Sequence, residues 1–550
     1  MTSVEPYPPW QWDIPEHFNI GVACLDAHAG TPAAERVAMV VEDEERGTVE
    51  ATYAELATRS SKFAQVLREL GVALGDRVLV RLPNSLDYPT AFLGTMKRGA
   101  IAVPTSTLLT AEEVLYLAKD SGAHVLVTDK KAWATLKDNL AGHEELKIVL
   151  LSGAGETAAV AGLKVLDLET ELAKIRSWEQ PHLSKADDAA YLVYTSGTTG
   201  YPKGVLHAHR ALLGRAPASQ YWFDFAPAEA PVDRIMHSGK FNWTYVLGSA
   251  LMDPLYLGKT VIVYEGSNHA DTWPRLIAKH GATIFIGVPT IYRQIVQKTR
   301  LGKDDVPSLR YCMSAGEHLS DEMLGLWRER FGRDIYEAVG MSEFSYYLSQ
   351  NPRRPICPGS AGFPQPGHAI RLLDPESLKE VAQGEEGMIC VPDDDPGLFL
   401  RYWNLPDETA KLVHDGWFFT GDYARYDADG YIWFLGRKDD IIKSFGYRVS
   451  PYEVERVMKS HAEVADCATV GEEIGQDKII VASYVIPQPD SKVTADELLA
   501  FAREHLAAYK APKVVYLAKD FPRTKNGKIL RRRIDPAMAT ARSKPASGRD

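Results

Sequence analysis

The chain has 550 residues, of which 45% are apolar and 25% are charged, and it carries a net charge of −11. At roughly 150 residues per domain, this length is too great for a single core. The composition is that of a globular protein, and the negative charge argues against nonspecific nucleic-acid binding. We therefore expect a multidomain, enzyme-sized protein.

The five cysteines are scattered and form no C-x-x-C pair, so they indicate neither a zinc site nor a disulfide framework. They are Cys24, Cys312, Cys357, Cys390 and Cys467. Residues 1–20 are rich in Pro, Trp and acidic residues, which is not the pattern of a signal peptide. No run approaches the roughly 18–20 apolar residues of a membrane span. We therefore expect a cytoplasmic protein with no membrane span.

Helices and strands alternate in the first part of the chain. Thr52 to Glu55 reads as a capping box, and the helix that it begins should end near Gly71. Strands are then predicted at residues 77–82, 100–103 and 124–128, and helices at 88–97 and 111–120. The same rhythm returns at 260–264, 273–280 and 283–287. Short connections between these elements favour parallel βαβ layers.

A loop rich in glycine and hydroxyl residues follows the apolar run 189–193. It reads Thr195-Ser196-Gly197-Thr198-Thr199-Gly200-Tyr201-Pro202-Lys203-Gly204. Free backbone N–H groups, hydroxyls and a lysine suit a triphosphate. It is not a Walker A loop, and the chain's one G-K-T, at residues 258–260, has Asp253 where the first glycine should be. The alternative is a flexible polar loop between a strand and a helix.

Residues 237–245 carry a cluster of aromatic side chains. Such a cluster can form a flat, apolar slot for an acyl group. Lys240 could neutralise a carboxylate there or merely lie at the surface. A core helix with ordinary aromatic packing is the competing interpretation.

Short strands and Asp-Gly turns begin near residue 390. Residues 423–426 and 431–435 should form a hairpin around the turn 427–430. This hairpin sets residue 422 roughly opposite residue 435, so Asp422 and Arg437 could approach one site. An Asp accepts hydrogen bonds from vicinal hydroxyls, and an Arg can orient a sugar or a phosphate. A plain surface ion pair is the alternative.

A compact α+β stretch follows, with helices predicted at 451–460 and 495–505. We place a domain boundary at Lys438-Asp439, which gives an N-terminal domain at 1–437 and a C-terminal domain at 438–535. Residues 536–550 are small and polar, so we expect a disordered tail. Lys528 lies on a glycine-containing loop and could stabilise developing charge in a cleft. With Arg531 to Arg533 beside it, a basic surface tail is the alternative.

The segment 195–204 closely resembles the phosphate loop of the adenylate-forming (ANL) superfamily, and the resemblance covers about residues 15–535. Further segments resemble other motifs of that superfamily: 340–343 its G-x-T-E motif, 420–422 and 436–439 its ribose motifs, 522–530 its catalytic-lysine motif, and 443–448 its CoA tunnel. Residues 237–248 and 340–351 look most like benzoate–CoA ligases, and similarity to medium-chain acyl-CoA synthetases is nearly as good.

The resemblance implies an α/β fold, with a large multi-sheet N-terminal domain, a β-rich subdomain and a small, mobile α+β C-terminal domain. It implies an AMP-forming acid–CoA ligase, which makes an acyl-AMP from an aromatic acid and Mg·ATP and transfers the acyl group to CoA. Alternatives are an aliphatic or alicyclic acid–CoA ligase, an adenylation enzyme that loads a carrier protein, and a nucleotide-binding regulator without turnover.

The resemblance also assigns residues. ATP would contact Thr195, Ser196, Gly197, Thr198, Thr199, Gly200, Lys203, Gly316, Glu317, Glu337, Ala338, Val339, Gly340, Met341, Ser342, Asp422, Arg437 and Lys528. Catalysis would rest on Lys528 and Glu343, and Mg²⁺ on Glu343 and Thr198. CoA would contact Lys443, Ser444, Gly446, Tyr447 and Arg448, and the acyl group Lys240, Phe241, Trp243 and Tyr245. Asp439 would be the hinge.

The chain differs from the usual superfamily motifs at two positions, and the resemblance also implies one form of regulation. Val339 stands where the superfamily usually has an aromatic residue, and Ser342 where it usually has Thr. Acetylation of Lys528 by a lysine acetyltransferase, reversed by a deacetylase, would stop the first half-reaction. Monomer and homodimer both remain open.

Overall fold

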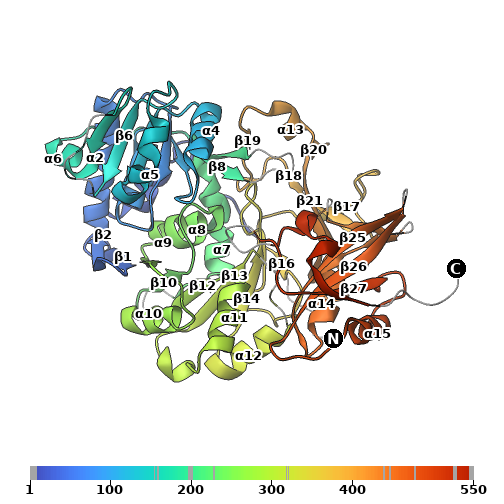
Figure 1. Ribbon diagram of the computed structural model, residues 1–550. Coiled ribbons are helices and arrows are strands. Elements are labelled where there is room, and N and C mark those ends of the chain that lie inside the picture. Colours follow the sequence, from blue (N-terminus) through green and yellow to red (C-terminus); the bar gives the residue numbers. More distant parts are fainter. Residues whose placement is uncertain are drawn as a thin grey trace.

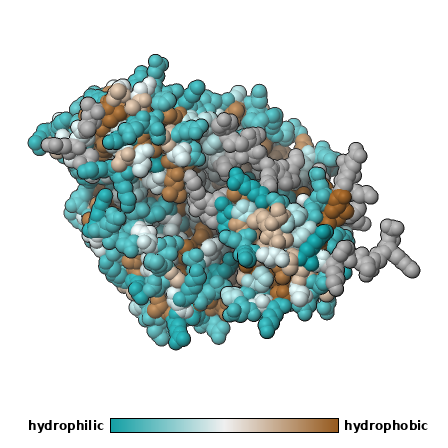
Figure 2. All heavy atoms as spheres, viewed as in Figure 1, coloured by the Kyte–Doolittle hydropathy of each residue, from teal (hydrophilic) through white to brown (hydrophobic). Residues whose placement is uncertain are grey.

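The computed structural model describes residues 9–153, 155, 157, 160–195, 202–226, 230–316, 319, 321–437, 440–444, 447–475, 478–523 and 529–543 (Figure 1). Among these residues, no helix combines the length and apolar character needed to cross a bilayer. Hydrophilic side chains cover most of the face drawn in Figure 2, with apolar ones scattered between them. Such scattered apolar residues are ordinary on a folded surface.

One mixed sheet has the strand order β19-β9-β8-β4-β3-β5-β6-β7. Strands β8 to β7 in this order pair in parallel, whereas β9 and β19 run antiparallel at one edge. The bounds are β3 (Arg77–Arg81), β4 (Ile101–Pro104), β5 (Val125–Asp129), β6 (Ile148–Ser152), β7 (Lys164–Asp167), β8 (Ala189–Thr195), β9 (Lys203–Ala208) and β19 (Arg401–Tyr402).

A second mixed sheet has the order β16-β15-β14-β13-β12-β10-β11-β1-β2. Its central strands β14 to β1 are parallel, and the edge strands are antiparallel. The bounds are β1 (Val37–Asp43), β2 (Gly47–Thr52), β10 (Arg234–His237), β11 (Thr260–Glu265), β12 (Ile284–Gly287), β13 (Tyr311–Ala315), β14 (Ile335–Val339), β15 (Leu348–Ser349) and β16 (Phe363–Pro364).

Helices cover both faces of each sheet, as the buried clusters show. Between the sheets lie α2 (Tyr53–Glu69), α3 (Asp87–Lys97) and α9 (Asp253–Tyr256). Helices α4 (Ala111–Ser121) and α5 (Lys130–Leu140) pack on the outer face of the first sheet. Helices α10 (Thr272–His280), α11 (Pro289–Lys298) and α12 (Asp321–Phe331) pack on the outer face of the second. Parallel βαβ layers are therefore confirmed.

Shorter elements connect these layers. They are α1 (Ile20–Cys24), η1 (Asp26–His28), α6 (Leu168–Lys174), η2 (His209–Ala211), η3 (Leu213–Arg215), α7 (Ala216–Tyr221), α8 (Thr244–Val246), the π-helix η4 (Leu247–Met252) and η5 (Lys303–Asp305). The predicted capping box is confirmed at α2, where the Thr52 hydroxyl accepts the Glu55 N–H at 3.2 Å and the Glu55 carboxylate accepts the Thr52 N–H at 2.7 Å. This exchange satisfies backbone donors at the helix start.

The third sheet is antiparallel and contains the predicted hairpin. Its strands are β17 (Arg371–Leu373), β18 (Gly387–Pro392), β20 (Val413–His414), β21 (Trp417–Tyr426) and β22 (Ile432–Arg437), and α13 (Pro406–Ala410) lies nearby in the chain. The side chain of Asp427 accepts the backbone N–H groups of Asp429 and Tyr431, which fixes the turn between β21 and β22.

The C-terminal part is a smaller α+β unit, drawn in orange and red in Figure 1. It contains β23 (Ile442–Ser444), β24 (Tyr447–Val449), α14 (Pro451–Lys459), β25 (Val464–Gly475), β26 (Lys478–Pro487), α15 (Ala495–His505), β27 (Val514–Ala518), η6 (Arg531–Arg533), η7 (Pro536–Met538) and β28 (Ala539–Arg542). The α/β fold class with a small α+β C-terminal domain is thereby confirmed.

The expectation of a disordered tail from residue 536 is wrong for residues 536–543. Strand β28 pairs antiparallel with β27. The Ser543 N–H donates to the Val515 carbonyl, and the Val515 N–H donates to the Ser543 hydroxyl oxygen. Small, polar residues can form an edge strand because most of their side chains face solvent there. Residues 544–550 lie outside the described residues.

A buried ion pair holds the helical segment that follows residue 243. The Arg215 guanidinium contacts the Asp253 carboxylate at 2.9 Å, and both side chains are almost fully buried. Tyr346 donates its hydroxyl to the same carboxylate, and Tyr191 lies 3.5 Å from the guanidinium. The cluster therefore satisfies a charge that could not be left alone in the core.

We expect Asp253→Ala to lower the free energy of unfolding by about 3–5 kcal/mol, because it leaves the Arg215 charge buried without a counter-ion. Urea unfolding followed by circular dichroism measures this loss. The matched control is Glu45→Ala, which breaks the exposed Lys131–Glu45 pair and should cost about 0–1 kcal/mol. Equal losses in the two variants would contradict the expectation.

Candidate active site

A cavity of about 180 Å³ lies between the C-terminal ends of β13 and β14, the β21–β22 hairpin and the start of α14. Gly316 and residues 337–340 line one side, Asp422 and Arg437 another, and Tyr452 belongs to the C-terminal unit. The volume is below the roughly 300–1,000 Å³ of typical small-molecule sites, so the cavity can enclose only part of an extended ligand.

Asp422 and Arg437 are paired directly across the hairpin. The Asp422 Oδ1 and Arg437 Nε atoms are 3.5 Å apart, and the carboxylate is buried. The carboxylate of Asp422 raises the pKa of Arg437, against the opposing effect of burial. The pairing of residue 422 with residue 435, predicted from the turn, is wrong. A register shift after Tyr423 makes Arg437 the partner instead.

Residues 337–340 form the wall opposite this pair. Glu337 is buried, and its carboxyl accepts the Leu319 N–H at 2.8 Å. Burial raises the pKa of Glu337 from 4.5 to about 8. Gly340 is required by close packing, since a Cβ there would collide with the backbone of Tyr346. The wall therefore combines exposed backbone with one carboxyl that is protonated at neutral pH.

A chain of polar contacts links Glu343 to Lys203. The Tyr402 hydroxyl donates to the buried Glu343 carboxylate at 2.6 Å. The ammonium of Lys203 lies 5.6 Å from the centre of the Tyr402 ring and 2.8 Å from the Glu408 carboxylate. Hydrogen bonds from Lys203 and Lys411 lower the pKa of Glu408 to about 2. A carboxylate and an ammonium, the groups that phosphates and their cations require, thus lie on two sides of one tyrosine.

Strands β8 and β9 bring the two ends of the predicted phosphate loop together. Thr195 pairs with Lys203 in an antiparallel register. The loop therefore joins two strands, and not a strand and a helix. Ser196, Gly197, Thr198, Thr199 and Gly200 lie outside the described residues.

An aromatic cluster adjoins the cavity at Gly316. A Cβ at Gly316, whose φ is +93°, would lie 3.2 Å from the Trp243 ring. Trp243 packs against Tyr245, with ring centres 5.2 Å apart, and Tyr245 packs against His237 at 5.0 Å and Trp222 at 6.2 Å.

Lys240 and Phe241 have their main contacts elsewhere, although Trp243 packs against the core cluster that contains Phe241. Lys240 is 2.6 Å from Glu265, and its side chain is 45% exposed. Phe241 is buried in the core between the sheets, against Tyr88.

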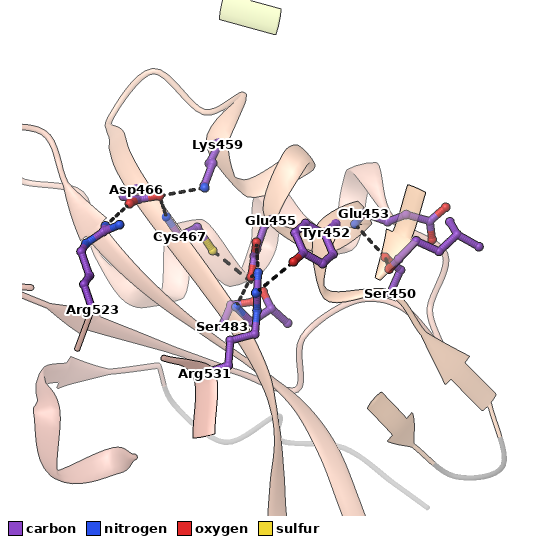
Figure 3. Close-up of polar contacts among 12 residues, drawn as sticks. Ser450, Tyr452, Glu453, Glu455, Lys459, Asp466, Cys467, Ser483, Arg523 and Arg531 are labelled. Atoms are coloured by element: carbon purple, nitrogen blue, oxygen red, sulfur yellow. Dashed lines mark hydrogen bonds and ion pairs between the residues drawn. The ribbon is translucent and has the colours of Figure 1, made fainter. Parts of the chain in front are cut away.

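The C-terminal unit holds both ends of the segment that contains Lys528 (Figure 3). Arg523 pairs with Asp466 at 2.6 Å, and Arg531 pairs with Glu455 through two hydrogen bonds of 2.8 and 2.9 Å. Between them, the Leu530 N–H donates to the Pro522 carbonyl at 2.7 Å. The neck of a loop is thus fixed by backbone pairing and by two ion pairs.

The same network reaches the cavity. The Arg531 guanidinium lies 4.5 Å from the centre of the Tyr452 ring and donates to its hydroxyl at 3.3 Å, and Tyr452 lines the cavity. The Ser450 hydroxyl donates to the Leu435 carbonyl of the hairpin. Contacts across the predicted domain boundary therefore connect the loop neck to the cavity wall.

Comparisons with known proteins agree with this geometry. The AMP-binding enzyme family matches residues 25–403, and the AMP-binding enzyme C-terminal domain matches residues 453–528. The chain belongs to the AMP-binding enzyme family. Its resemblance to the adenylate-forming superfamily is thereby confirmed.

Relatives of this AMP-binding enzyme include a benzoate–CoA ligase and an acyl-coenzyme A synthetase. Benzoate–CoA ligase of Thauera aromatica is 32% identical over 530 residues, which cover 95% of this chain and 97% of that protein. Mitochondrial acyl-coenzyme A synthetase ACSM3 of Mus musculus is 30% identical over 95% of this chain and 91% of that protein. The crystal structure of the anthranilate CoA ligase AuaEII with anthranoyl-AMP superposes with a TM-score of 0.81 at 29% identity, covering 94% of this chain and 96% of that one.

Several further residues that were assigned to the site from the sequence lie outside the described residues of this AMP-binding enzyme, as the loop residues named above do. They are Glu317, Asp439, Gly446 and Lys528. Of the CoA segment, Ser444 is described, buried and hydrogen-bonded to the Ile479 carbonyl at 2.9 Å. The backbone of Lys443, Tyr447 and Arg448 belongs to β23 and β24.

Other elements bring residues to the site that no sequence motif predicted. Tyr402 and Glu408 reach Glu343 and Lys203 from strand β19 and helix α13, and Tyr452 comes from beyond the predicted boundary. No local pattern distinguishes these residues. His207 follows the phosphate loop in sequence, and its Nε2 is 2.8 Å from the Ser342 carbonyl while its ring stacks on Tyr191.

The raised pKa of Glu337 predicts a pH dependence of stability. Between pH 4.5 and about 8 the folded state keeps a proton that the unfolded state loses, so the free energy of unfolding falls as pH rises through this window. The slope from one such group reaches roughly 1.4 kcal/mol per pH unit. Glu337→Gln cannot titrate, so urea unfolding between pH 5 and 8 should show the variant gaining stability relative to the parent as pH rises. A difference that is independent of pH would sink the prediction.

Proposed function

We propose that this enzyme is an AMP-forming carboxylic acid–CoA ligase that activates an aromatic, benzoate-type acid through an acyl-AMP. The observation that carries the proposal is one cavity, lined by Asp422, Arg437 and residues 337–340, that adjoins an aromatic cluster at Gly316. A nucleoside site and an aryl site that share a wall suit a reaction between a carboxylate and a nucleotide.

In this proposal the cavity holds the nucleoside of ATP. The buried Asp422 carboxylate accepts hydrogen bonds from the ribose hydroxyls, while Arg437 orients the sugar or a phosphate. The backbone of Glu337, Ala338, Val339 and Gly340 lines the adenine. With Val339 in place of an aromatic residue, Tyr452 supplies an aromatic ring to the same cavity.

The phosphates would lie toward the strand ends that carry Thr195 and Lys203, together with Ser342 and Met341. Mg²⁺ fits here through Glu343, because a carboxylate oxygen is a hard ligand, and through the predicted Thr198 hydroxyl. Within the described ranges, no group of three or more His, Cys, Asp or Glu side chains could hold a metal ion. Phosphate oxygens and water would therefore supply most of the ligands, and the ion would offset phosphate charge.

The reaction has two steps. A carboxylate oxygen of the acid attacks the α-phosphorus of ATP and pyrophosphate leaves, which gives the acyl-AMP. The CoA thiolate then attacks the acyl carbon, and AMP leaves with its phosphate oxygen. We propose that the domain 438–535 rotates about Asp439 between the steps, so that Lys528 serves the first and the segment 443–448 lines the CoA path in the second.

A short-chain, medium-chain or alicyclic acid remains the second candidate substrate, and the similarity to acyl-coenzyme A synthetase ACSM3 favours it. One or two side chains in an apolar slot shift preference by only about 1–3 kcal/mol. A carrier-protein acceptor, acetylation of Lys528, cytoplasmic location, and a monomer or homodimer stay predictions.

A pyrophosphate-release screen tests the substrate class. With Mg·ATP and CoA present, we expect benzoates to give higher kcat/KM than cyclohexanecarboxylate and C4–C8 fatty acids, because the cluster around Tyr245 consists of aromatic rings. A preference for the fatty acids would establish the second candidate. Turnover with a carrier protein but not with CoA would show that the acyl acceptor is a carrier protein and not CoA.

A variant of Lys528, in the segment between Arg523 and Arg531, tests whether this lysine serves only the first of the two reaction steps. We expect Lys528→Ala to abolish pyrophosphate release while thioester formation from supplied acyl-AMP and CoA is retained, because the lysine stabilises charge only in the first step. Lys525→Ala in the same loop is the matched control and should keep both steps. Equal loss of both steps in Lys528→Ala would argue against the assignment.

A further inference from the structure

Two buried polar atoms in the aromatic cluster have no hydrogen-bond partner among the described residues. They are the Nε2 of His237 and the hydroxyl oxygen of Tyr245. We propose that these two atoms select an aromatic acid that carries a hydroxyl group on its ring. This inference rests on the proposed function, because it names the substrate class of the same site.

The contacts of His237 fix its tautomer. The residue is fully buried, and its Nδ1 accepts the Gly239 N–H at 2.8 Å. An imidazole nitrogen that accepts must be the unprotonated one, so the proton of the neutral ring lies on Nε2. Burial lowers the pKa of His237 to about 3, so the ring is neutral at physiological pH. His237 therefore presents an N–H donor that lacks an acceptor.

Tyr245 lies beside this donor. The two ring centres are 5.0 Å apart and the planes are inclined at 71°. Burial alone raises the pKa of Tyr245, so its hydroxyl stays protonated and can both donate and accept. Each buried polar group without a partner costs roughly 1–3 kcal/mol, so a ligand that satisfies both gains this energy back.

A series of ring contacts connects the pair to the wall of the nucleotide cavity. From Gly316 in the cavity wall, the contacts run through Trp243 to Tyr245 and then to His237. In this proposal the carboxylate of the acid lies near the cavity and its aromatic ring lies across Trp243. The edge of the substrate ring that is farthest from the carboxylate then faces the polar pair. This order of contacts separates the reacting group from the recognised substituent.

The chemistry of the surroundings selects a neutral substituent. Burial is the only cause of either pKa shift that the described residues supply. The buried residues of this cluster include Trp222, Ile286 and Met313, which are apolar. A second carboxylate or an ammonium would lose its hydration here without a counter-charge. A hydroxyl oxygen accepts from Nε2–H and its proton can go to Tyr245, whereas a methyl group satisfies neither.

The test compares substituents of equal size. Pyrophosphate release is measured with the three hydroxybenzoates and the three methylbenzoates, and the best isomer of each set is compared by kcat/KM. We expect the hydroxybenzoate to be preferred by about tenfold or more, which corresponds to one well-formed hydrogen bond in a buried site. Equal values, or a preference for the methylbenzoate, would overturn the proposal.

Three variants locate the effect. His237→Asn can still accept the Gly239 N–H but has no group at the Nε2 position, so the preference should fall to within about threefold. His237→Gln places an amide N–H near that position and should restore part of the preference. Tyr245→Phe should also reduce it. Tyr88→Phe, which removes a buried hydroxyl that donates to the Phe241 carbonyl, is the matched control and should leave the ratio unchanged.

Thermal unfolding of each variant shows whether the variant is folded. The ratio of the kcat/KM values for two substrates, measured on one protein, is in addition independent of the fraction of active enzyme. An unchanged ratio in His237→Asn would refute the role of Nε2. Release with fatty acids but with no aryl acid would instead refute the proposed function, and the two failures are thereby distinguished.

Discussion

The antiparallel pairing of β21 with β22 is the constraint on which the site depends. It places the buried Asp422 directly opposite Arg437 at the edge of the cavity, so that a carboxylate and a guanidinium face one ligand. The same hairpin also carries the small domain. Its Leu435 carbonyl accepts the Ser450 hydroxyl, and its Trp433 ring lies 5.0 Å from the Arg456 guanidinium. A change in the pairing would therefore disturb both the ligand site and the contacts with the C-terminal domain.

The C-terminal domain meets this hairpin with residues that also hold the loop neck near Lys528. One terminal nitrogen of Arg531 donates to both carboxylate oxygens of Glu455, and the guanidinium lies over the ring of Tyr452, which lines the cavity (Figure 3). Arg531 therefore couples the loop neck to the cavity wall through short, charge-assisted contacts. In contrast, the Arg425–Glu453 contact across the boundary is 3.4 Å long with the arginine 40% exposed, and such a pair is worth little. The attachment of the domain to the hairpin therefore depends more on the buried Ser450–Leu435 hydrogen bond than on this exposed ion pair.

Local patterns predicted local structure well. The capping box at Thr52, the alternating elements of the two parallel sheets and the helix at 495–505 depend on neighbours in sequence, and the structure contains them. The register of Asp422 depends on an extra residue in β22, which no turn rule reveals. The partners of Glu343 and Lys203 come from β19 and α13, far along the chain, and edge strand β28 forms because β27 offers it a free edge. These features are set by tertiary contacts, which a single sequence does not display.

Two kinds of buried polar group occur in the protein, those with partners and those without. In the core, the charged pair of Arg215 and Asp253 is saturated by Tyr346 and Tyr191, as a low-dielectric interior requires. Beside the cavity, the Nε2 of His237 and the hydroxyl of Tyr245 are without partners among the described residues, although both are as deeply buried. A folded chain tolerates such a cost where a ligand later removes it, since stability and function compete at binding sites. Neutral donors without partners in an aromatic cluster favour a ligand with a hydroxyl group and disfavour a charged ligand. The residues that lower the stability of the empty protein are therefore those that would give it selectivity.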